Sequence, residues 1–240
     1  MYGLPFPEGV LGEMTYPDDY INRVICGDCL DIMKGMPDKS VDLVVTDPPY
    51  NAGRAYKNDN LNEIEYNDFT DRWLSACKRI TKDNLVVIVG VKYQKPIITW
   101  LFDNMNYCWE FVWWKSNGML NEKAILAHFD KVIWFAKRTG TYYRTKKVPT
   151  DVWNLPIRLK KYDPGHPTPK EVKGMSKIII LLSKETDIIL DPFLGSGTTA
   201  VACKQLNRRF IGIEINPEYC KIAEKRLKSI PESLFNQGTL

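Results

Sequence analysis

Two short apolar segments each end in an Asp-Pro pair, and together they limit the folds open to this chain. The segments are VDLVVTD, residues 41–47, and DIILD, residues 187–191. Apolar runs of this length without polar alternation are typical of strands buried on both faces of a parallel sheet. A third run, RRFIGIEI at 208–215, has the same character. Segments of helical spacing alternate with these runs, so the sequence predicts an α/β protein with a doubly wound, mostly parallel sheet.

The other elements follow from the same two periodicities. Residues 67–81 carry apolar side chains at helical spacing, and Asn67 is a candidate N-cap. We expect further strands in 23–28, 84–90, 107–114 and 131–137, and further helices in 29–36, 93–105, 170–184, 197–207 and 216–230. Residues 1–22 are predicted to form an N-terminal arm, 23–230 a single domain and 231–240 a C-terminal tail.

Composition narrows the class of protein. Of the 240 residues, 44% are hydrophobic, and 33 Lys and Arg face 29 Asp and Glu. A disordered polyelectrolyte would have fewer apolar residues and a larger net charge. No window approaches the ~20 apolar residues of a membrane helix, and the first residues lack the basic and apolar regions of a secretory signal. We therefore expect a cytoplasmic protein that does not associate with membranes.

Basic side chains are concentrated in one segment. Residues 137–161 hold eight Lys and Arg and a single acid, Asp151. Tyr142, Tyr143 and Trp153 lie among them. Cations interleaved with aromatic rings suit a phosphate backbone and exposed bases. A solvated charged face is the alternative interpretation of such a run.

The six cysteines do not predict a metal site. Cys26 and Cys29 form a C-x-x-C pair, but a zinc site needs a second pair of ligands, and His128 and His166 stand alone in the sequence. Reduced thiols are the expected state of a chain without an export signal. We therefore predict no metal.

A glycine turn predicts a nucleoside ligand. In residues 187–216 a predicted strand ends at Asp191, a turn follows, and the next strand ends at Glu214. Glycines let the backbone approach a ligand closely, and an acid at the end of the following strand can hold a ribose diol. The turn reads GSGTTA, so Ala200 replaces the third glycine of a dinucleotide site and the lysine of a P-loop is absent. The turn alone leaves phosphate binding open.

The first Asp-Pro segment continues as DPPYN, residues 47–51. Consecutive prolines fix φ and bring carbonyl groups without N–H donors. The Asp47 carboxylate and the Pro48 carbonyl are therefore candidate rigid acceptors, with the ring of Tyr50 beside them. This arrangement suits a planar ring that bears an exocyclic amino group. A plain turn with a packed tyrosine is the alternative interpretation.

The chain resembles the β class of S-adenosylmethionine-dependent DNA amino-methyltransferases. The resemblance lies in DPPY at 47–50 and DPFLGSGTT at 191–199, and it extends from about residue 23 to residue 227. It implies a Rossmann-like methyltransferase fold with a circularly permuted motif order and a small recognition insert. It also implies S-adenosylmethionine as the cofactor and DNA as the partner, in a restriction-modification setting.

The resemblance assigns roles to individual residues. It implies that catalysis uses Asp47, Pro48, Pro49 and Tyr50. It implies that the cofactor is bound by Asp28, Cys29, Asp191, Phe193, Gly195, Ser196, Gly197, Thr198, Thr199 and Glu214. Thr168 and Lys170 are further candidates at the cofactor site, whereas Glu171 departs from the proline that the family often has there.

The resemblance also implies what is methylated. An aspartate at position 47 favours the N6 amine of adenine, and cytosine N4 is the alternative. The target base must leave the helical stack to be reached. Residues 138–165 are the candidate recognition segment, and a second copy of the chain is an implied partner because the family often forms homodimers. A non-catalytic nucleic-acid-binding subunit is the remaining alternative, although both motifs are intact.

Overall fold

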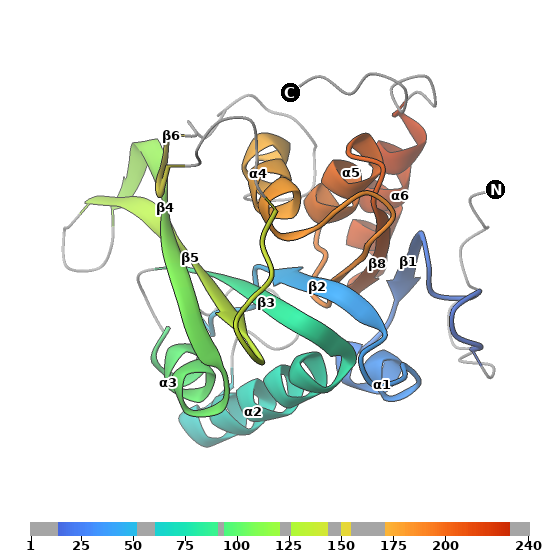
Figure 1. Ribbon diagram of the computed structural model, residues 1–240, viewed down its shortest axis with the longest axis horizontal. Helices are drawn as coiled ribbons and strands as arrows, with labels where there is room; N and C mark the ends of the chain where they lie inside the picture. The colour runs from blue at the N-terminus through green and yellow to red at the C-terminus, as the bar shows by residue number, and fades with distance from the viewer. Residues whose placement is uncertain are drawn as a thin grey trace.

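The computed structural model describes residues 14–51, 61–90, 94–120, 126–143, 150–154 and 171–230. These residues form a single eight-stranded sheet in the order β1-β8-β7-β2-β3-β5-β4-β6 (Figure 1). The strands are β1 Arg23–Cys26, β2 Val41–Thr46, β3 Thr81–Val89, β4 Asn106–Leu120, β5 Leu126–Ala136, β6 Val152–Asn154, β7 Ile188–Asp191 and β8 Arg209–Glu214. The helices are α1 Cys29–Lys34, α2 Glu63–Ile80, α3 Lys95–Asn104, α4 Val172–Leu182, α5 Thr198–Gln205 and α6 Pro217–Lys228.

The sheet is parallel through its first five strands. From β1 to β3 every neighbouring pair runs parallel, whereas β5 is antiparallel to both β3 and β4, and β6 lies parallel to β4. Helices cover both faces: α1, α2 and α3 lie below the sheet in Figure 1, and α4, α5 and α6 lie above it. The predicted doubly wound, mostly parallel α/β sheet is confirmed.

The central strands divide their side chains between two cores. In β2, Val41 and Val44 pack in the core on the side of α1 and α2, and Leu43 and Val45 pack in the core on the side of α4 and α5. Because both faces are covered, a strand here needs apolar residues at successive positions. This explains why β2 and β7 appear in the sequence as unbroken apolar runs.

The chain changes its winding direction between β7 and β2. From β7 the chain crosses through α5, on one face, to β8; from β2 it crosses through α2, on the other face, to β3. The two crossovers leave these neighbouring strands in opposite directions. Ligands of doubly wound sheets bind beyond the carboxyl ends of the strands at such a switch point. Asp191 ends β7, and Asp47 follows β2.

Helix α2 begins earlier than its apolar spacing indicated. Asn62, rather than Asn67, is the N-cap: its side chain accepts from the Glu65 N–H at 2.9 Å, and the Glu65 side chain accepts from the Asn62 N–H. This capping box satisfies two backbone donors that the helix start leaves unpaired. The first turn is mostly polar and exposed, which is why the apolar spacing did not reveal it.

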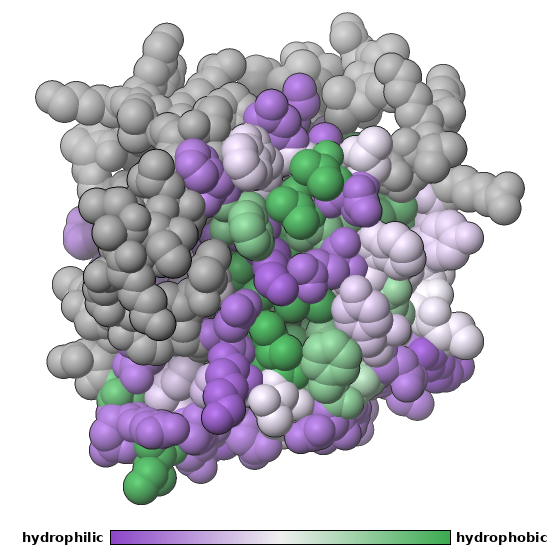
Figure 2. All heavy atoms as spheres, turned by 90° about the vertical axis from the view of Figure 1, so that its left-hand side faces the viewer, coloured by the Kyte–Doolittle hydropathy of each residue, from purple (hydrophilic) through white to green (hydrophobic). Residues whose placement is uncertain are grey.

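The β4–β5 side of the molecule exposes apolar side chains among polar ones (Figure 2). Trp109 is 52% exposed and Tyr107 is 48% exposed. Within the candidate recognition segment, Tyr142 is exposed, but Trp153 is buried and its ring stacks on Phe111 with centroids 4.8 Å apart. Trp153 is therefore a core residue rather than a surface for bases. None of the described helices is both long and apolar enough to cross a membrane.

Candidate active site

The two predicted motifs meet at the carboxyl edge of the sheet. Strands β2 and β7 are adjacent and parallel, with Val44 paired to Leu190. The motifs follow these strands directly. The Thr46 hydroxyl donates to Asp191 Oδ1 at 2.8 Å, although the two residues are 145 positions apart in sequence. The structure therefore places the residue before Asp47 in direct contact with the residue that opens the glycine motif.

The Asp191 carboxylate is buried and accepts several hydrogen bonds. Its Oδ1 also accepts from the Phe193 N–H at 3.1 Å, and its Oδ2 accepts from the Thr199 hydroxyl at 2.5 Å. Burial raises the pKa of Asp191, the donors from Thr199, Thr46 and Phe193 lower it, and the charge of Asp47 raises it slightly, so that the pKa is about 6. The side chain ties together the start of the glycine turn, the first turn of α5 and the end of β2.

The glycine turn needs its glycines for two different reasons. Gly195 and Gly197 have φ of 55° and 87°, in the left-handed region that favours glycine. A Cβ atom on Gly197 would also lie 2.7 Å from the Cβ of Ala223 in α6. The turn thus combines a left-handed backbone with close packing between α5 and α6.

Glu214 supports the turn from the end of β8. Its Oε2 accepts from the Gly195 N–H at 2.7 Å, and its Oε1 accepts from the Asn216 N–H at 2.8 Å. Burial raises the pKa of Glu214, and these backbone donors oppose the shift. A carboxylate has about four acceptor positions, so Glu214 keeps capacity for further donors such as a ribose diol.

Asp28 and Cys29 lie next to Glu214. Strand β1 pairs with β8 so that Cys26 is opposite Glu214, and the Gly27 N–H donates to the Glu214 carbonyl at 2.9 Å. Asp28 is the N-cap of α1 and accepts from Leu30 N–H at 2.9 Å, while Cys29 is buried. Burial raises the pKa of the Cys29 thiol. The structure thus brings both residues to the same edge as the glycine turn.

One supporting residue escaped the sequence analysis. Arg226 in α6 donates to the Ser196 carbonyl at 2.6 Å, to the Ser196 hydroxyl at 2.9 Å and to the Thr198 hydroxyl at 3.3 Å. Earlier in the same motif, the ring of Phe193 meets Trp73 of α2 edge to face, with centroids 5.2 Å apart. Arg226 lies 30 residues from Ser196 in the sequence. It belongs to an amphipathic helix whose basic residues are expected to face solvent, so the sequence did not single it out.

The proline turn is held by side chains of its neighbours. The Tyr66 hydroxyl in α2 donates to the Pro49 carbonyl at 3.0 Å, and Pro48 is buried. The Tyr50 hydroxyl lies within hydrogen-bond distance of two acceptors, the Asp47 carboxylate and the Ile88 carbonyl, the latter at 2.7 Å. The motif therefore lies between α2 and the end of β3.

The Tyr50 phenol approaches Asp47 as a neutral donor. Burial raises the pKa of Tyr50 well above its usual range, and the charges of Asp47 and Asp130 raise it further. The phenol consequently keeps its proton. The Tyr50 hydroxyl thus already donates to the Asp47 carboxylate, which the sequence analysis had assigned as the acceptor for an exocyclic amine.

Asn51 closes the end of the proline turn. Its backbone is left-handed, with φ of 55°. Its side-chain amide donates to the Leu61 carbonyl and its amide oxygen accepts from the Leu61 N–H, both at 2.8 Å. The side-chain amide of Asn51 therefore pairs with the backbone N–H and carbonyl of Leu61, as the backbone of a neighbouring strand would. Leu61 directly precedes the capping box of α2.

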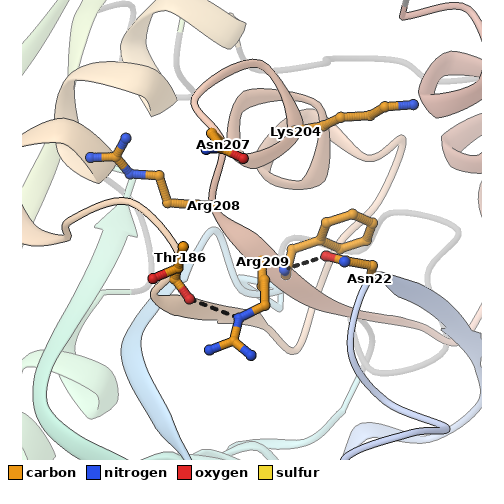
Figure 3. A pocket seen from close by; sticks show the side chains of 7 residues that line it. Asn22, Thr186, Lys204, Asn207, Arg208 and Arg209 are labelled. Atoms are coloured by element: carbon orange, nitrogen blue, oxygen red, sulfur yellow. Dashed lines mark hydrogen bonds between the residues drawn. The ribbon is translucent and has the colours of Figure 1, made fainter. Parts of the chain in front are cut away.

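A hollow lined by cationic side chains lies at the opposite edge of the sheet, at the amino ends of the strands (Figure 3). Its cationic side chains bind backbone groups: Arg208 donates to Leu206 and Ser183, Lys204 to Leu227, and the Arg209 Nε to Thr186 at 2.7 Å. Figure 3 shows Arg208 and Lys204 pointing in opposite directions. The hollow connects the turns that precede β1, β7 and β8, and it lies at the amino ends of those strands, away from both motifs.

Several predicted residues lie outside the described part of the chain. These are Thr168, Lys170 and His166, the arm before residue 14, the tail after 230 and most of the segment 138–165. Lys137 was counted among the basic residues of the segment 137–161. Its ammonium donates to the carbonyls of Arg79 and Thr81, so this cation has a structural role within the domain. Among the described residues, no group of three His, Cys, Asp or Glu could hold a metal ion.

Comparison with known proteins is consistent with this geometry. A family model described as DNA methylase matches residues 41–225. The Type II methyltransferase M.HpaI of Haemophilus parainfluenzae is 33% identical over 233 residues, which cover 86% of this chain and 74% of the relative. The Type II methyltransferase M.HinfI of Haemophilus influenzae is 30% identical over 253 residues, which cover 89% of this chain and 70% of the relative.

Solved structures share the fold. The complex of M1.HpyAVI with SAM superposes with a TM-score of 0.66 at 26% identity and covers 85% of this chain and 98% of its own. The cytosine-N4-specific PvuII DNA methyltransferase superposes with a TM-score of 0.71 at 22% identity and covers 89% of this chain and 90% of its own. The predicted Rossmann-like methyltransferase fold is confirmed.

Proposed function

We propose that this chain, which belongs to the DNA methylase family, methylates the N6 amine of adenine in a flipped-out base at a specific DNA site. The chain is an enzyme that uses S-adenosylmethionine as methyl donor and DNA as partner. One observation carries the residue-level proposal: the hydrogen bond from Thr46 to Asp191 joins the proline turn to the glycine turn at the switch point of the sheet.

The glycine turn and its surroundings fit the cofactor. The left-handed Gly195 and Gly197 leave a surface without side chains, and Glu214 keeps free acceptor capacity at the end of β8. We assign the methionine part to Phe193 and the Gly195–Thr199 turn, the ribose diol to Glu214, and the adenine end to Asp28 and Cys29. When bound, S-adenosylmethionine would supply a methyl group on a positively charged sulfur, which leaves readily as a neutral thioether.

The proline turn would then hold the target amine. The Asp47 carboxylate and the Pro48 carbonyl would each accept a hydrogen bond from one N–H of the amine, which favours a pyramidal nitrogen with a free lone pair. Preorganised acceptors also stabilise the positive charge that develops on this nitrogen. Tyr50 supports this assignment, because its phenol already donates to Asp47. With the base in place, the ring of Tyr50 would stack on it and offset part of the cost of extrusion.

The choice of adenine rests on the residue at position 47. An aspartate there favours adenine N6 in this family, and cytosine N4 remains the second candidate. For DNA recognition we assign residues 138–165, whose basic side chains suit phosphates. We place the enzyme in the cytoplasm of a bacterial, archaeal or phage-infected cell, where its DNA substrate lies, with the homodimer as its candidate assembly.

The direct test is the chemistry of the product. DNA from a methylation-deficient host is incubated with the purified chain and isotopically labelled S-adenosylmethionine, and the nucleosides are then analysed by mass spectrometry. We expect N6-methyladenine. Label in N4-methylcytosine would replace the proposal by its alternative, and no labelled nucleoside would contradict it. Sequencing of the same DNA for modified bases gives the recognition site.

Two variants test the assigned acceptor. Asp47→Ala is expected to lose methyl transfer by more than about 1,000-fold while still binding S-adenosylmethionine, because the residue touches the amine and not the donor. Asp42→Ala is the control, since it removes a carboxylate near the opposite end of β2, where Asp42 pairs with Lys82 at 2.6 Å and accepts from the Ile188 N–H at 2.9 Å, away from both motifs. Equal activity of Asp47→Ala and the parental chain would refute the assigned mechanism.

A further inference from the structure

One hydrogen bond joins the two halves of the sheet at the active edge. The halves diverge between β7 and β2, where the crossovers leave on opposite faces. Beyond the backbone pairing of Leu43 with Ile189 and of Val44 with Leu190, the bond from the Thr46 hydroxyl to Asp191 Oδ1 continues the connection. Thr46 is also the residue that immediately precedes Asp47.

Water is excluded from this connection. Thr46 is 0% exposed, Asp191 is 4% exposed and Thr199 is 2% exposed. A buried carboxylate that loses a donor has no solvent to replace it, so each of these bonds contributes more than a surface bond would. The three side chains therefore hold one another in a fixed geometry.

Asp191 transmits position in both directions. Its Oδ1 is shared between the Thr46 hydroxyl and the Phe193 N–H, and its Oδ2 accepts from Thr199 in the first turn of α5. The backbone that we assign to the methyl donor and the backbone that presents the amine acceptors are thus fixed to a single carboxylate. In-line methyl transfer depends on the distance between these two half-sites, and an error of about 1 Å can cost about 100-fold in rate.

We propose that Thr46 is a positioning residue for methyl transfer, because its bond to Asp191 fixes the amine-accepting turn relative to the donor-binding turn. The proposal rests on the proposed function. It assigns Thr46 no contact with cofactor or DNA. Loss of the hydroxyl should consequently slow the transfer step while each half-site still binds its own ligand.

Three variants separate positioning from packing. Thr46→Val keeps the shape and burial of the side chain but removes the donor. Thr46→Ser keeps the donor and removes a methyl group. Thr70→Val is the matched control: Thr70 is a buried threonine in α2 whose hydroxyl has no hydrogen-bond partner in the described part of the chain. Melting curves establish that each variant is folded.

The experiment measures binding and chemistry separately. The dissociation constant for S-adenosylmethionine is measured by calorimetry without DNA, and single-turnover methyl transfer is measured on unmethylated plasmid DNA. For Thr46→Val we expect a cofactor dissociation constant within about threefold of the parental value and a transfer rate roughly 10- to 100-fold lower, as for a lost hydrogen bond to a charged group. Thr46→Ser should recover most of the rate, and Thr70→Val should match the parental chain.

Each contrary result has a distinct meaning. A Thr46→Val chain that transfers at the parental rate would overturn the inference and leave the proposed function intact. Equal losses in Thr46→Val and Thr46→Ser, or an equal loss in Thr70→Val, would overturn it as well, because packing would then explain the effect. A parental chain that transfers no methyl group to DNA would overturn the proposed function, and this inference with it.

Discussion

The turns after β7 and β2 occupy equivalent positions on neighbouring strands, yet they are made rigid in opposite ways. The turn after β7 uses glycines in left-handed conformations, held from outside by Arg226 and Glu214. The turn after β2 uses proline rings that fix φ, held by Tyr66 at the Pro49 carbonyl.

The difference follows from what each turn must present. A turn that binds a cofactor along its backbone needs N–H groups and no side chains in the way, which glycine provides. A turn that binds an amine needs fixed acceptors, and proline provides carbonyl groups without a competing donor. The two turns should therefore respond to different substitutions, and the following variants test that expectation from the largest effect to the smallest.

Gly197→Ala should break the glycine turn. The new Cβ would lie 2.7 Å from the Ala223 Cβ, at a φ of 87° that disfavours alanine. We expect a destabilisation of about 2–4 kcal/mol and a loss of cofactor affinity of more than about 100-fold. Gly90→Ala is the stability control beside the proline turn, because its Cβ would meet Tyr50 at 3.8 Å, an ordinary contact. Denaturant unfolding and calorimetry check both; equal stability of the two variants would contradict the close-packing argument.

Asp191 lies beneath both turns, and its ionisation should lower stability. The unfolded chain loses this proton near pH 3.8 and the folded chain near pH 6. The protonated Asp191 side chain therefore stabilises the fold fully below the unfolded pKa of 3.8. This stabilisation is lost progressively as the pH rises through the folded pKa of about 6. At about 1.4 kcal/mol per pKa unit, the loss is about 3 kcal/mol.

Asp191→Asn cannot ionise, and it provides the measurement. Its unfolding free energy relative to the parental chain should rise by about 3 kcal/mol in total between about pH 3 and pH 7, most of it between pH 4 and pH 6, and then remain constant. Denaturant titrations at several pH values test this, since the other acids titrate in both chains. If the unfolding free energies of Asp191→Asn and the parental chain change with pH in the same way, ionisation of the buried Asp191 does not destabilise the fold. Methyl transfer by Asp191→Asn should nevertheless fall, because the geometry of both turns depends on the carboxylate.

Arg226→Gln should weaken the glycine turn without breaking it. The variant shortens the side chain that holds Ser196 and Thr198. We expect a cofactor dissociation constant about tenfold higher, with turnover recovered at saturating cofactor. Lys228→Gln, which removes the same charge from an exposed position of α6, is the control. A fall in turnover without a change in cofactor affinity would contradict this role and would indicate that Arg226 supports the turn that binds the target amine.

Tyr66→Phe should give the smallest effect and confine it to the proline turn. It removes one neutral hydrogen bond to the Pro49 carbonyl, worth about 1 kcal/mol, so we expect turnover to fall about fivefold with cofactor affinity unchanged. Tyr20→Phe is the control, since it removes a buried hydroxyl that donates to the Ile32 carbonyl in α1. If both variants lose activity equally, general destabilisation explains the result.

Sequence alone predicted the elements that have a strong local pattern. Strands such as β2 and β7 are unbroken apolar runs because both their faces are covered, and the motifs follow them directly. The meeting of Asp47 and Asp191 at one edge was predictable, because parallel strands place their carboxyl ends together.

Side-chain connections between distant segments were not predictable. Arg226 belongs to an amphipathic helix whose other cations are exposed, so nothing in its surroundings marks it as a support of Ser196. Trp153 lies within a basic segment that suggested a surface, yet it packs on Phe111 because β6 pairs with β4. The start of α2 at Glu63 depended on a polar cap, which apolar periodicity does not detect.

The paired hydrogen bonds between Asn51 and Leu61 have a consequence for how such a chain can change over time. Two 2.8 Å hydrogen bonds hold residue 51 next to residue 61. Insertions, deletions or transplanted sequences between these residues should leave the DPPY motif undisturbed. Evolution or protein engineering could therefore change the segment between residues 51 and 61, and with it the contacts to DNA, without altering the catalytic residues.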